Sequence, residues 1–353
     1  MDATYRVAMI GVDYPHASAW RESIGLMDNV ELVAMANGPF DGQGSSGSAA
    51  PVIGAKGTKE KPVPTFDSID ELMAETEFDG AMVMLSNAAK PDVCVRLAEA
   101  KKHVFAEKPV ARNATEMQRI VDAVKANGVA FSTGYTWRFH PIMTKVRDHI
   151  QNGDFGRVYA MQVRMLTSSI EDRGPDHFLF SAEHSGSGMV GWLGCHPLDL
   201  MLFFIDRKVK SVTAKVGHIG EPKAEVEDGG TAVLEFEDGA LATLMCGFYL
   251  KKFYGDSLYS IQGTTGWADW VTKPCDLRYM FKSMDQPKTE NLDLPPIGGY
   301  GGQTALDLLN DWLDSGREGR QTQINEDNAL RVLKTVDAIY ESSETGQRID
   351  VEI

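Results

Sequence analysis

The sequence contains few cysteines, and none of them stands at the spacing of a metal-binding pair. There are four, without any Cys-x-x-Cys arrangement: Cys94, Cys195, Cys246 and Cys275. Neither a zinc site nor a disulfide framework is therefore predicted. Reduced thiols are typical of a cytosolic protein. We expect a cytoplasmic protein that binds no metal.

Positive charge and long apolar runs are also scarce. Lys and Arg number 35 against 50 Asp and Glu, which gives a formal net charge of -15 that would repel a polyanion. No apolar run is long enough to span a bilayer, and the N-terminus leads into a predicted strand rather than a signal peptide. We therefore expect neither nucleic acid nor a membrane as a partner, which leaves small neutral or weakly charged ligands.

A regular alternation of strands and helices is present in the first third of the chain. The 353 residues exceed what one hydrophobic core usually holds, so two domains are expected. The first is predicted over residues 1–134 as an α/β doubly wound parallel sheet of the Rossmann type. Its strands are expected at 5–10, 30–36, 80–85, 103–106 and 129–133, and its helices near 17–27, 69–75, 90–101 and 114–127.

The pattern changes after Gly134, where strands follow one another. They are expected at 157–167, 209–218, 230–236, 240–248 and 257–262, with helices near 303–315 and 325–344. This succession predicts a second domain over residues 135–353, of α+β class and built on a large, mostly antiparallel sheet. One face of such a sheet is open, and in many proteins a partner subunit covers it.

The tripeptide Glu107-Lys108-Pro109 follows the predicted strand 103–106 directly. Its lysine therefore lies at the carboxyl end of a strand, where open α/β sheets bind their ligands. Glu107 can pair with the lysine, and Pro109 fixes the backbone just beyond it. An ordinary surface turn is the alternative for these three residues alone.

The turn after the first strand is the expected place for a dinucleotide's pyrophosphate, at the start of a helix. It reads Gly11-Val12-Asp13-Tyr14-Pro15-His16 and keeps only the first glycine of G-x-G-x-x-G. A plain strand-to-helix turn is the alternative. Asp13 would repel a pyrophosphate, which His16 could compensate. Asn37, at the end of the second strand, can bond a ribose without repelling a 2'-phosphate, so NAD and NADP both remain open.

A glycine-rich segment, 186–194, leads into a helix start that carries His196 and Asp199. Residues three apart on a helix share a face, so both side chains can point into one cleft. A buried structural histidine and an aspartate that complements the helix dipole are the alternatives.

These segments, in this order, resemble the Gfo/Idh/MocA family of oxidoreductases over nearly the whole chain. The resemblance rests on residues 98–109, 134–141, 153–158, 193–199, 326–333 and 343–346. It implies a Rossmann domain, a second domain whose open sheet mediates homodimers or homotetramers, and a nicotinamide near the lysine of Glu-Lys-Pro. It also implies an NAD(P)-dependent oxidoreductase acting on a carbohydrate, polyol or cyclitol. Lys108 would bind or polarise the reacting oxygen, and His196 would exchange its proton.

The same resemblance assigns the remaining site residues. The cofactor would contact Gly11, Val12, Asp13, Tyr14, Pro15, His16, Asn37, Ser86, Asn87, Glu107, Lys108 and Pro109. The substrate would contact Lys108, Trp137, Arg138, Asp176, His177, Trp192, His196 and Asp199.

The chain departs from the family pattern Asp-x-Gly-x-His, because Trp192 takes the place of the aspartate. A tryptophan accepts no proton; it can stack on a sugar or fill space. Either Lys108 and His196 suffice, or another acid such as Asp176, Glu183 or Asp199 enters the site. The departure also leaves two other activities open. One is a lyase or glycosidase that retains NAD and oxidises its sugar transiently, and the other is a nucleotide- or sugar-binding protein without catalysis.

Overall fold

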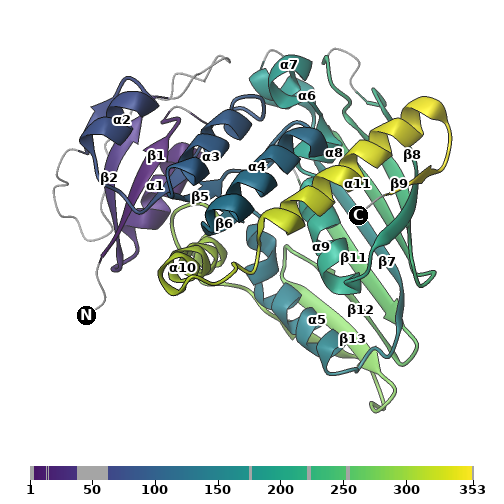
Figure 1. Ribbon diagram of the computed structural model, residues 1–353. Helices are drawn as coiled ribbons and strands as arrows, with labels where there is room; N and C mark the ends of the chain where they lie inside the picture. Colours follow the sequence, from purple (N-terminus) through teal and green to yellow (C-terminus); the bar gives the residue numbers. More distant parts are fainter. Residues whose placement is uncertain are drawn as a thin grey trace. The chain divides into compact units, whose positions relative to one another are not determined.

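The computed structural model describes residues 4–12, 14, 16–37, 63–174, 177–220, 224–251 and 255–351 (Figure 1). Its contacts divide the chain into two compact units. Unit 1 consists of residues 1–136, 183–185 and 295–330, and unit 2 of residues 137–182, 186–294 and 331–353. Three predicted site residues, Asp13, Pro15 and Asp176, lie outside the described residues.

Unit 1 is built on a six-stranded sheet in the order β3-β2-β1-β4-β5-β6, and every neighbouring pair is parallel. Its strands are β1 (Tyr5–Ile10), β2 (Val30–Ala36), β3 (Thr65–Phe66), β4 (Gly80–Val83), β5 (His103–Ala106) and β6 (Phe131–Thr133). Its helices are α1 (Ala17–Gly25), α2 (Ile69–Glu75), α3 (Lys90–Glu99), α4 (Ala114–Asn127) and α10 (Gln303–Glu318). The predicted Rossmann sheet is confirmed.

Local sequence accounts for the ends of these helices. The Asn113 side chain accepts a hydrogen bond from the Glu116 N–H and caps the start of α4, and Gly128 ends it with a φ of +63°. Ser68 caps α2 in the same way by accepting from the Glu71 N–H. The sheet between the helices is buried, and four of the six residues of β1 have no exposed surface. This packing fixes the carboxyl ends of the strands.

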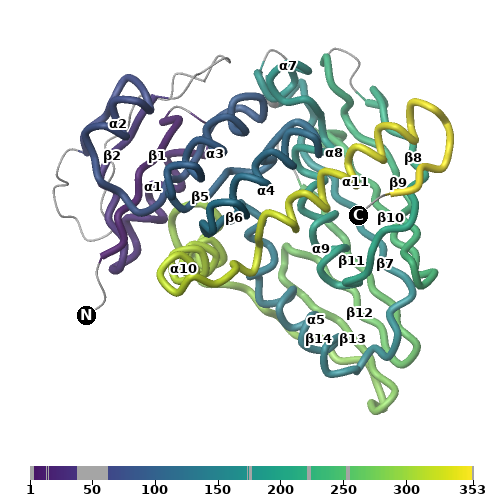
Figure 2. Tube along the Cα trace, viewed as in Figure 1, coloured from purple at the N-terminus to yellow at the C-terminus, as the bar shows by residue number. Residues whose placement is uncertain are grey.

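The segment 295–330 belongs to unit 1, so the two units are not divided by a single boundary after residue 134. The buried side of α10 carries Trp312, whose ring centroid lies 5.9 Å from that of Tyr5 and 5.7 Å from that of Phe105. A side chain at Gly80 would come within 2.9 Å of the same indole. Figure 2 shows α10 beside the strands of this unit. The sequence did not indicate this packing, because α10 and the residues on which it packs lie far apart along the chain.

Unit 2 is built on a nine-stranded sheet in the order β14-β13-β12-β11-β7-β10-β9-β8-β15. Its strands are β7 (Val158–Ser168), β8 (Val209–Gly217), β9 (Gly229–Phe236), β10 (Leu241–Leu250), β11 (Asp256–Gly263), β12 (Gly266–Val271), β13 (Asp276–Phe281), β14 (Lys288–Asn291) and β15 (Ile349–Asp350). The pair β7 and β10 is parallel and the others are antiparallel, which confirms a mostly antiparallel sheet.

The remaining helices are mostly short. They are η1 (Thr136–Phe139), α5 (Pro141–Gln151), α6 (Ile170–Arg173), η2 (Phe178–Phe180), α7 (Ala182–Ser185), α8 (Met189–Trp192), α9 (Cys195–Ile205) and α11 (Glu326–Thr345). Of these, α8 and α9 pack on β10 and cover one face of the nine-stranded sheet. The other face exposes apolar side chains at Val233, Leu241, Met245 and Leu258, each about 40% accessible. Side chains of α8 and α9 are therefore held against a rigid sheet.

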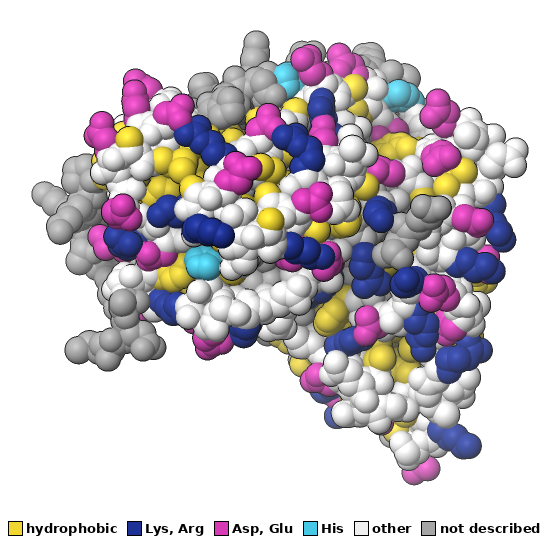
Figure 3. Space-filling view, viewed as in Figure 1, with side chains coloured by type: hydrophobic (Ala, Val, Ile, Leu, Met, Phe, Trp, Pro, Cys, Tyr) yellow, Lys and Arg dark blue, Asp and Glu magenta, His cyan; other side chains and the backbone are white. Residues whose placement is uncertain are grey.

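No single helix among the described residues has the length and apolar character needed to cross a membrane, although the bent pair Ala182–Trp192 and Cys195–Ile205 meets that test. The face shown in Figure 3 mixes Lys and Arg with Asp and Glu.

Candidate active site

Lys108 stands in the turn that leaves the carboxyl end of β5. Its side chain is 1% exposed, and the preceding Glu107 has no exposed surface. The Glu107 N–H donates to the Val83 carbonyl at 3.0 Å, which ties the turn to the neighbouring strand. A Cβ at Gly134 would lie 3.1 Å from the Glu107 carboxylate and 3.4 Å from the Lys108 side chain. The lysine is thus held in a tightly packed turn rather than on the surface.

The Glu107 carboxylate is occupied by two partners from the start of α1. The indole Nε1 of Trp20 donates to Oε2 at 2.7 Å, and Nδ1 of His16 lies 3.0 Å from Oε1. Burial alone would raise the pKa of Glu107, but the hydrogen bond and charge of His16, together with Lys108 and Lys90, hold it below its ordinary value. Glu107 therefore stays ionised and links the Lys108 turn to α1.

Tyr300 covers this cluster from the segment before α10. Its ring stacks on Trp20 with centroids 4.5 Å apart and lies 4.7 Å from the ring of His16. Its backbone N–H donates to the Ala19 carbonyl at 3.1 Å, which fixes the segment to α1. Nothing in the sequence pointed to Tyr300, because the residues that it covers lie almost 300 positions earlier.

The turn between β1 and α1 fits a pyrophosphate-binding role. Gly11 has a φ of +90°, and a Cβ there would lie 1.8 Å from the Met84 carbonyl oxygen, so only glycine fits. The helix α1 has no side-chain cap and no acidic residue in its first turn. The amides of its first turn can therefore bind an anion, with the Glu107 carboxylate, held by His16 and Trp20, also near the start of the helix. Val12 is half-buried, whereas Tyr14 is 3% exposed and directs its ring toward the Lys90 ammonium, 5.7 Å away.

Ser86 and Asn87, which are expected to contact the cofactor, form hydrogen bonds within the protein in the loop after β4. The Ser86 hydroxyl accepts from the Ala89 N–H at 3.3 Å at the start of α3. The amide of Asn87 is engaged at both ends, because Nδ2 donates to the Ser185 carbonyl and Oδ1 accepts from Lys90. Both side chains hold the loop. Asn37 is exposed at the end of β2, where a ribose can reach its amide.

In unit 2, His196 lies in the first turn of α9 and is 4% exposed. The indole of Trp137 stacks on its ring, with centroids 4.5 Å apart and planes inclined by 14°. Two residues that were each expected in the substrate site, Trp137 and His196, thus lie side by side. The stack fixes the plane in which the two imidazole nitrogens lie.

Arg138 and Asp199, which are both expected in the substrate site, bind each other. Nε of Arg138 donates to Oδ2 of Asp199 at 2.8 Å, and Nη2 binds the other oxygen. The two side chains are 8% and 1% exposed. Burial raises the pKa of Asp199, against the charges of Arg138 and Arg331. The pair anchors α9 one turn beyond His196.

Trp192 and His177, which are also expected to contact substrate, lie in unit 2. Trp192, at the end of α8, is 4% exposed. Nδ1 of His177 accepts the Leu179 N–H at 3.2 Å and caps a single turn. Glu183, another acid considered for the site, belongs to unit 1, and its carbonyl accepts from Arg112 at 3.2 Å.

Glu227 is a residue that the sequence did not single out. Its carboxylate is 7% exposed and accepts the N–H groups of Gly188 at 2.7 Å and Val190 at 2.8 Å. A Cβ at Gly188 would lie 1.8 Å from the Glu227 carbonyl oxygen, so the glycine is needed for this approach. Burial raises the pKa of Glu227, opposed by the Val190 hydrogen bond. The glutamate fixes the segment that carries Trp192 toward His196.

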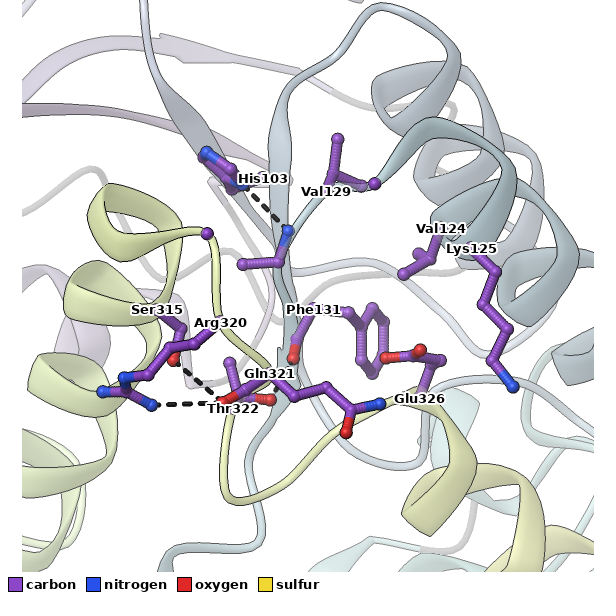
Figure 4. Close-up of a pocket in the computed structure, with 13 residues that line it drawn as sticks. His103, Val124, Lys125, Val129, Phe131, Ser315, Arg320, Gln321, Thr322 and Glu326 are labelled. Atoms are coloured by element: carbon purple, nitrogen blue, oxygen red, sulfur yellow. Dashed lines mark hydrogen bonds between the residues drawn. The ribbon is translucent and has the colours of Figure 1, made fainter.

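A cavity of about 200 Å³ in unit 1 lies away from Lys108 (Figure 4). His103 lines it at the first residue of β5, at the opposite end of the strand from Lys108. Nδ1 of His103 accepts the Ala130 N–H at 2.9 Å, and the Thr322 hydroxyl donates to the Ile324 carbonyl at 2.9 Å. Because parallel sheets bind ligands at their carboxyl edge, this cavity is not the candidate active site.

A parallel six-stranded sheet with an uncapped helix and a buried lysine at its carboxyl edge defines a dinucleotide-binding protein of the Rossmann class. Two family models match the chain. The "Oxidoreductase family, NAD-binding Rossmann fold" matches residues 5–135, and the "GFO/IDH/MocA C-terminal domain" matches residues 143–269. Together they cover more than half of the chain. The protein belongs to the Gfo/Idh/MocA family of oxidoreductases, with an NAD-binding domain in unit 1.

Individual relatives are distant in sequence. D-xylose 1-dehydrogenase (NADP(+)) 2 of Haloferax volcanii is 24% identical over 304 residues, which is 83% of this chain and 87% of that protein. Myo-inositol 2-dehydrogenase of Thermotoga maritima is 25% identical over 177 residues, 49% of this chain and 51% of that protein. The chain thus spans about half the length of some relatives that it matches.

The fold also matches a solved structure. Levoglucosan dehydrogenase in complex with NADH and levoglucosan superposes with a TM-score of 0.86 over 99% of this chain and 100% of that chain. The sequences are 19% identical, so the match concerns the fold.

Proposed function

We propose that this protein is an NAD(P)-dependent oxidoreductase that transfers hydride to or from a hydroxyl-bearing carbon of a sugar, polyol or cyclitol. The observation that carries the proposal is Lys108, buried at the carboxyl end of β5 in an NAD-binding Rossmann unit. The names of the relatives, which are dehydrogenases of D-xylose, levoglucosan and myo-inositol, support the substrate class.

Each of the two candidate catalytic residues has one task. The bound nicotinamide accepts or supplies the hydride. The Lys108 amine binds the reacting oxygen and stabilises the charge that develops on it. His196, whose ring orientation is fixed by Trp137, takes the hydroxyl proton during oxidation and returns it during reduction. Gly11 and the start of α1 hold the pyrophosphate, and Glu107 keeps the Lys108 turn attached to that helix.

Hydride transfer is tested by adding D-xylose, levoglucosan and myo-inositol, each with NAD and with NADP, and following the absorbance of the reduced cofactor. The proposal predicts a change with at least one polyol or sugar and its loss in Lys108→Ala, while that variant still binds NADH. Product formation from a glycoside with no net change in cofactor would instead identify the lyase or glycosidase that retains NAD. An absence of turnover across a wide panel would favour a binding protein.

We also propose that the open face of the nine-stranded sheet joins copies of this chain. Its exposed apolar side chains at Val233, Leu241, Met245 and Leu258 come from β9, β10 and β11, with β7 between β10 and β11, on the face that α8 and α9 leave open. Exposed apolar side chains gathered on one face of a sheet are typical of a subunit interface.

Met245→Glu should therefore convert the assembly to monomers in light scattering after size-exclusion chromatography. Ile219→Glu is the matched control, because Ile219 is also exposed but lies in a loop outside that face. An unchanged mass in the Met245 variant would contradict the proposed interface.

A further inference from the structure

Lys90 is a buried lysine that the proposed reaction does not use. It is the first residue of α3, and its side chain has no exposed surface. A buried ammonium is costly unless acceptors surround it. Nζ of Lys90 donates to the Glu107 carbonyl at 2.8 Å, to the Pro109 carbonyl, and to Oδ1 of Asn87 at 3.1 Å.

Two of these acceptors belong to the residues on either side of Lys108. The single ammonium group of Lys90 therefore binds the backbone both before and after the candidate catalytic lysine. Its third acceptor, Asn87, is itself fixed to the Ser185 carbonyl at 2.8 Å. The positive charge also contributes to the low pKa of Glu107, which burial alone would raise. Charge-assisted hydrogen bonds of this kind are stronger than those between neutral groups.

We propose that Lys90 is a positioning residue that sets the place of the Lys108 amine by holding the two carbonyls that flank it. The proposal rests on the proposed role of Lys108 in hydride transfer. It predicts that loss of the Lys90 ammonium lowers kcat more than it lowers affinity for the cofactor, because a small displacement of a reacting group is costly to the rate.

Lys102 offers a matched control in the same unit. Its Nζ also donates to a backbone carbonyl, that of Phe78, at 2.8 Å, and it lies 4.8 Å from the centroid of the Phe78 ring. It stands just before β5, at the opposite end of that strand from Lys108. Lys102→Met thus removes a comparable hydrogen bond without touching the turn.

The experiment compares Lys90→Met and Lys102→Met in the full-length protein. It measures the thermal midpoint, NADH affinity by fluorescence, kcat for hydride transfer, and hydrogen exchange of the peptide that spans residues 104–111. We expect Lys90→Met to lose about 100-fold in kcat with nearly unchanged NADH affinity, and to exchange faster in this peptide. Lys102→Met should lose thermal stability without either change. Equal kcat values in the two variants would overturn the proposal.

If Lys90→Met does not fold, Lys90→Gln tests the positioning role instead, because the glutamine amide keeps two N–H donors without the positive charge. A kcat within about twofold of the wild type in that variant would overturn the proposal, and a loss of tenfold or more would support it. Absence of hydride transfer in the wild type would refute the proposed function instead. In that case hydrogen exchange still decides whether Lys90 holds the turn, since unchanged exchange in both Lys90 variants overturns it.

Discussion

The turn of Lys108 and the segment that precedes His196 are held by buried side chains of opposite charge. In unit 1 the Lys90 ammonium binds carbonyl oxygens on both sides of Lys108. In unit 2 the Glu227 carboxylate binds the N–H groups of Gly188 and Val190, ahead of His196. A cation suits a turn that presents carbonyls, and an anion suits one that presents amides. In both units a charged residue from elsewhere fixes the backbone near a candidate catalytic side chain.

The two units also treat their buried carboxyl groups differently. The pKa of Glu107 in unit 1 is lowered, because the His16 hydrogen bond and the nearby cations outweigh burial. The pKa values of Asp199 and Glu227 in unit 2 are raised, because burial outweighs Arg138 in one case and the Val190 N–H in the other. The surroundings of Glu107 therefore favour its ionised form, whereas those of Asp199 and Glu227 resist ionisation.

The largest effect on stability is expected from Arg138→Met in unit 2. The change leaves Asp199, which is 1% exposed, buried without its bidentate partner. Removal of one member of a buried ion pair costs about 3–5 kcal/mol in the free energy of unfolding. Denaturant unfolding of the variant measures this loss. A loss below about 1 kcal/mol would show that the pair does not anchor α9.

Arg147→Met is the control for that variant, because Arg147 also lies over the Phe203 ring, at 4.8 Å, but pairs with the exposed Asp206. Its loss should cost about 1 kcal/mol or less.

A smaller effect is expected from Glu227→Gln, which weakens the hold on the segment before His196. The amide keeps one acceptor oxygen but loses the charge, so we expect about 1–3 kcal/mol less stability. We also expect a lower kcat with unchanged NADH affinity, since the cofactor residues lie in unit 1. Glu225→Gln is the matched control, because the exposed Glu225 accepts a single N–H, that of Ala182, at 3.0 Å. Similar kcat values in the Glu227 and Glu225 variants would contradict the view that Glu227, like Lys90, positions a candidate catalytic side chain.

The smallest effect is expected from pH. Because the folded-state pKa of Glu107 lies below its ordinary value of 4.5, its contribution to stability is present above pH 4.5 and is lost as the pH falls through the folded pKa. The folded-state pKa values of Asp199 and Glu227 are raised, so these two groups stabilise the folded state more at low pH than at high pH. The contribution of Glu107 should therefore be lost on acidification, and His16→Gln should move that loss to a higher pH. Hydrogen exchange of the peptide that carries Glu107, measured between pH 3 and pH 6, follows this loss, and the same pH dependence in the wild type and in His16→Gln would contradict it.

The sequence predicted the sheet of unit 1 because its signals are local. The bounds of β1, β2, β5, α2 and α4 match the expected ranges, since alternating apolar runs, Ser68, Asn113 and Gly128 mark them in place. The sequence did not predict that α10 belongs to this unit, nor the helix α5 and the strands β12 to β14. The packing of α10 depends on partners far along the chain, whereas β12 to β14 pair with their neighbours in sequence and were missed for lack of a clear local signal.

The residues of the candidate site also fall into two groups, those that a motif marks and those that only the fold brings together. Lys108 and His196 stand in recognisable motifs, and the stack of His196 on Trp137 joins two residues that were both expected in the site. Lys90, Tyr300 and Glu227 carry no motif, because each acts on backbone or rings that only the fold brings near. The protein partners of Ser86, Asn87, Arg138 and Asp199 likewise carry no motif, and the expected ligand contacts of these four residues stay predictions.

The most direct test of the account is the rate of hydride transfer by Lys108→Ala, measured beside its affinity for NADH. The account predicts a loss of about 10²- to 10⁴-fold in kcat with cofactor binding retained, because the amine acts on the reacting oxygen. Turnover at the wild-type rate would contradict it, since the buried lysine at the end of β5 would then play no part in the reaction.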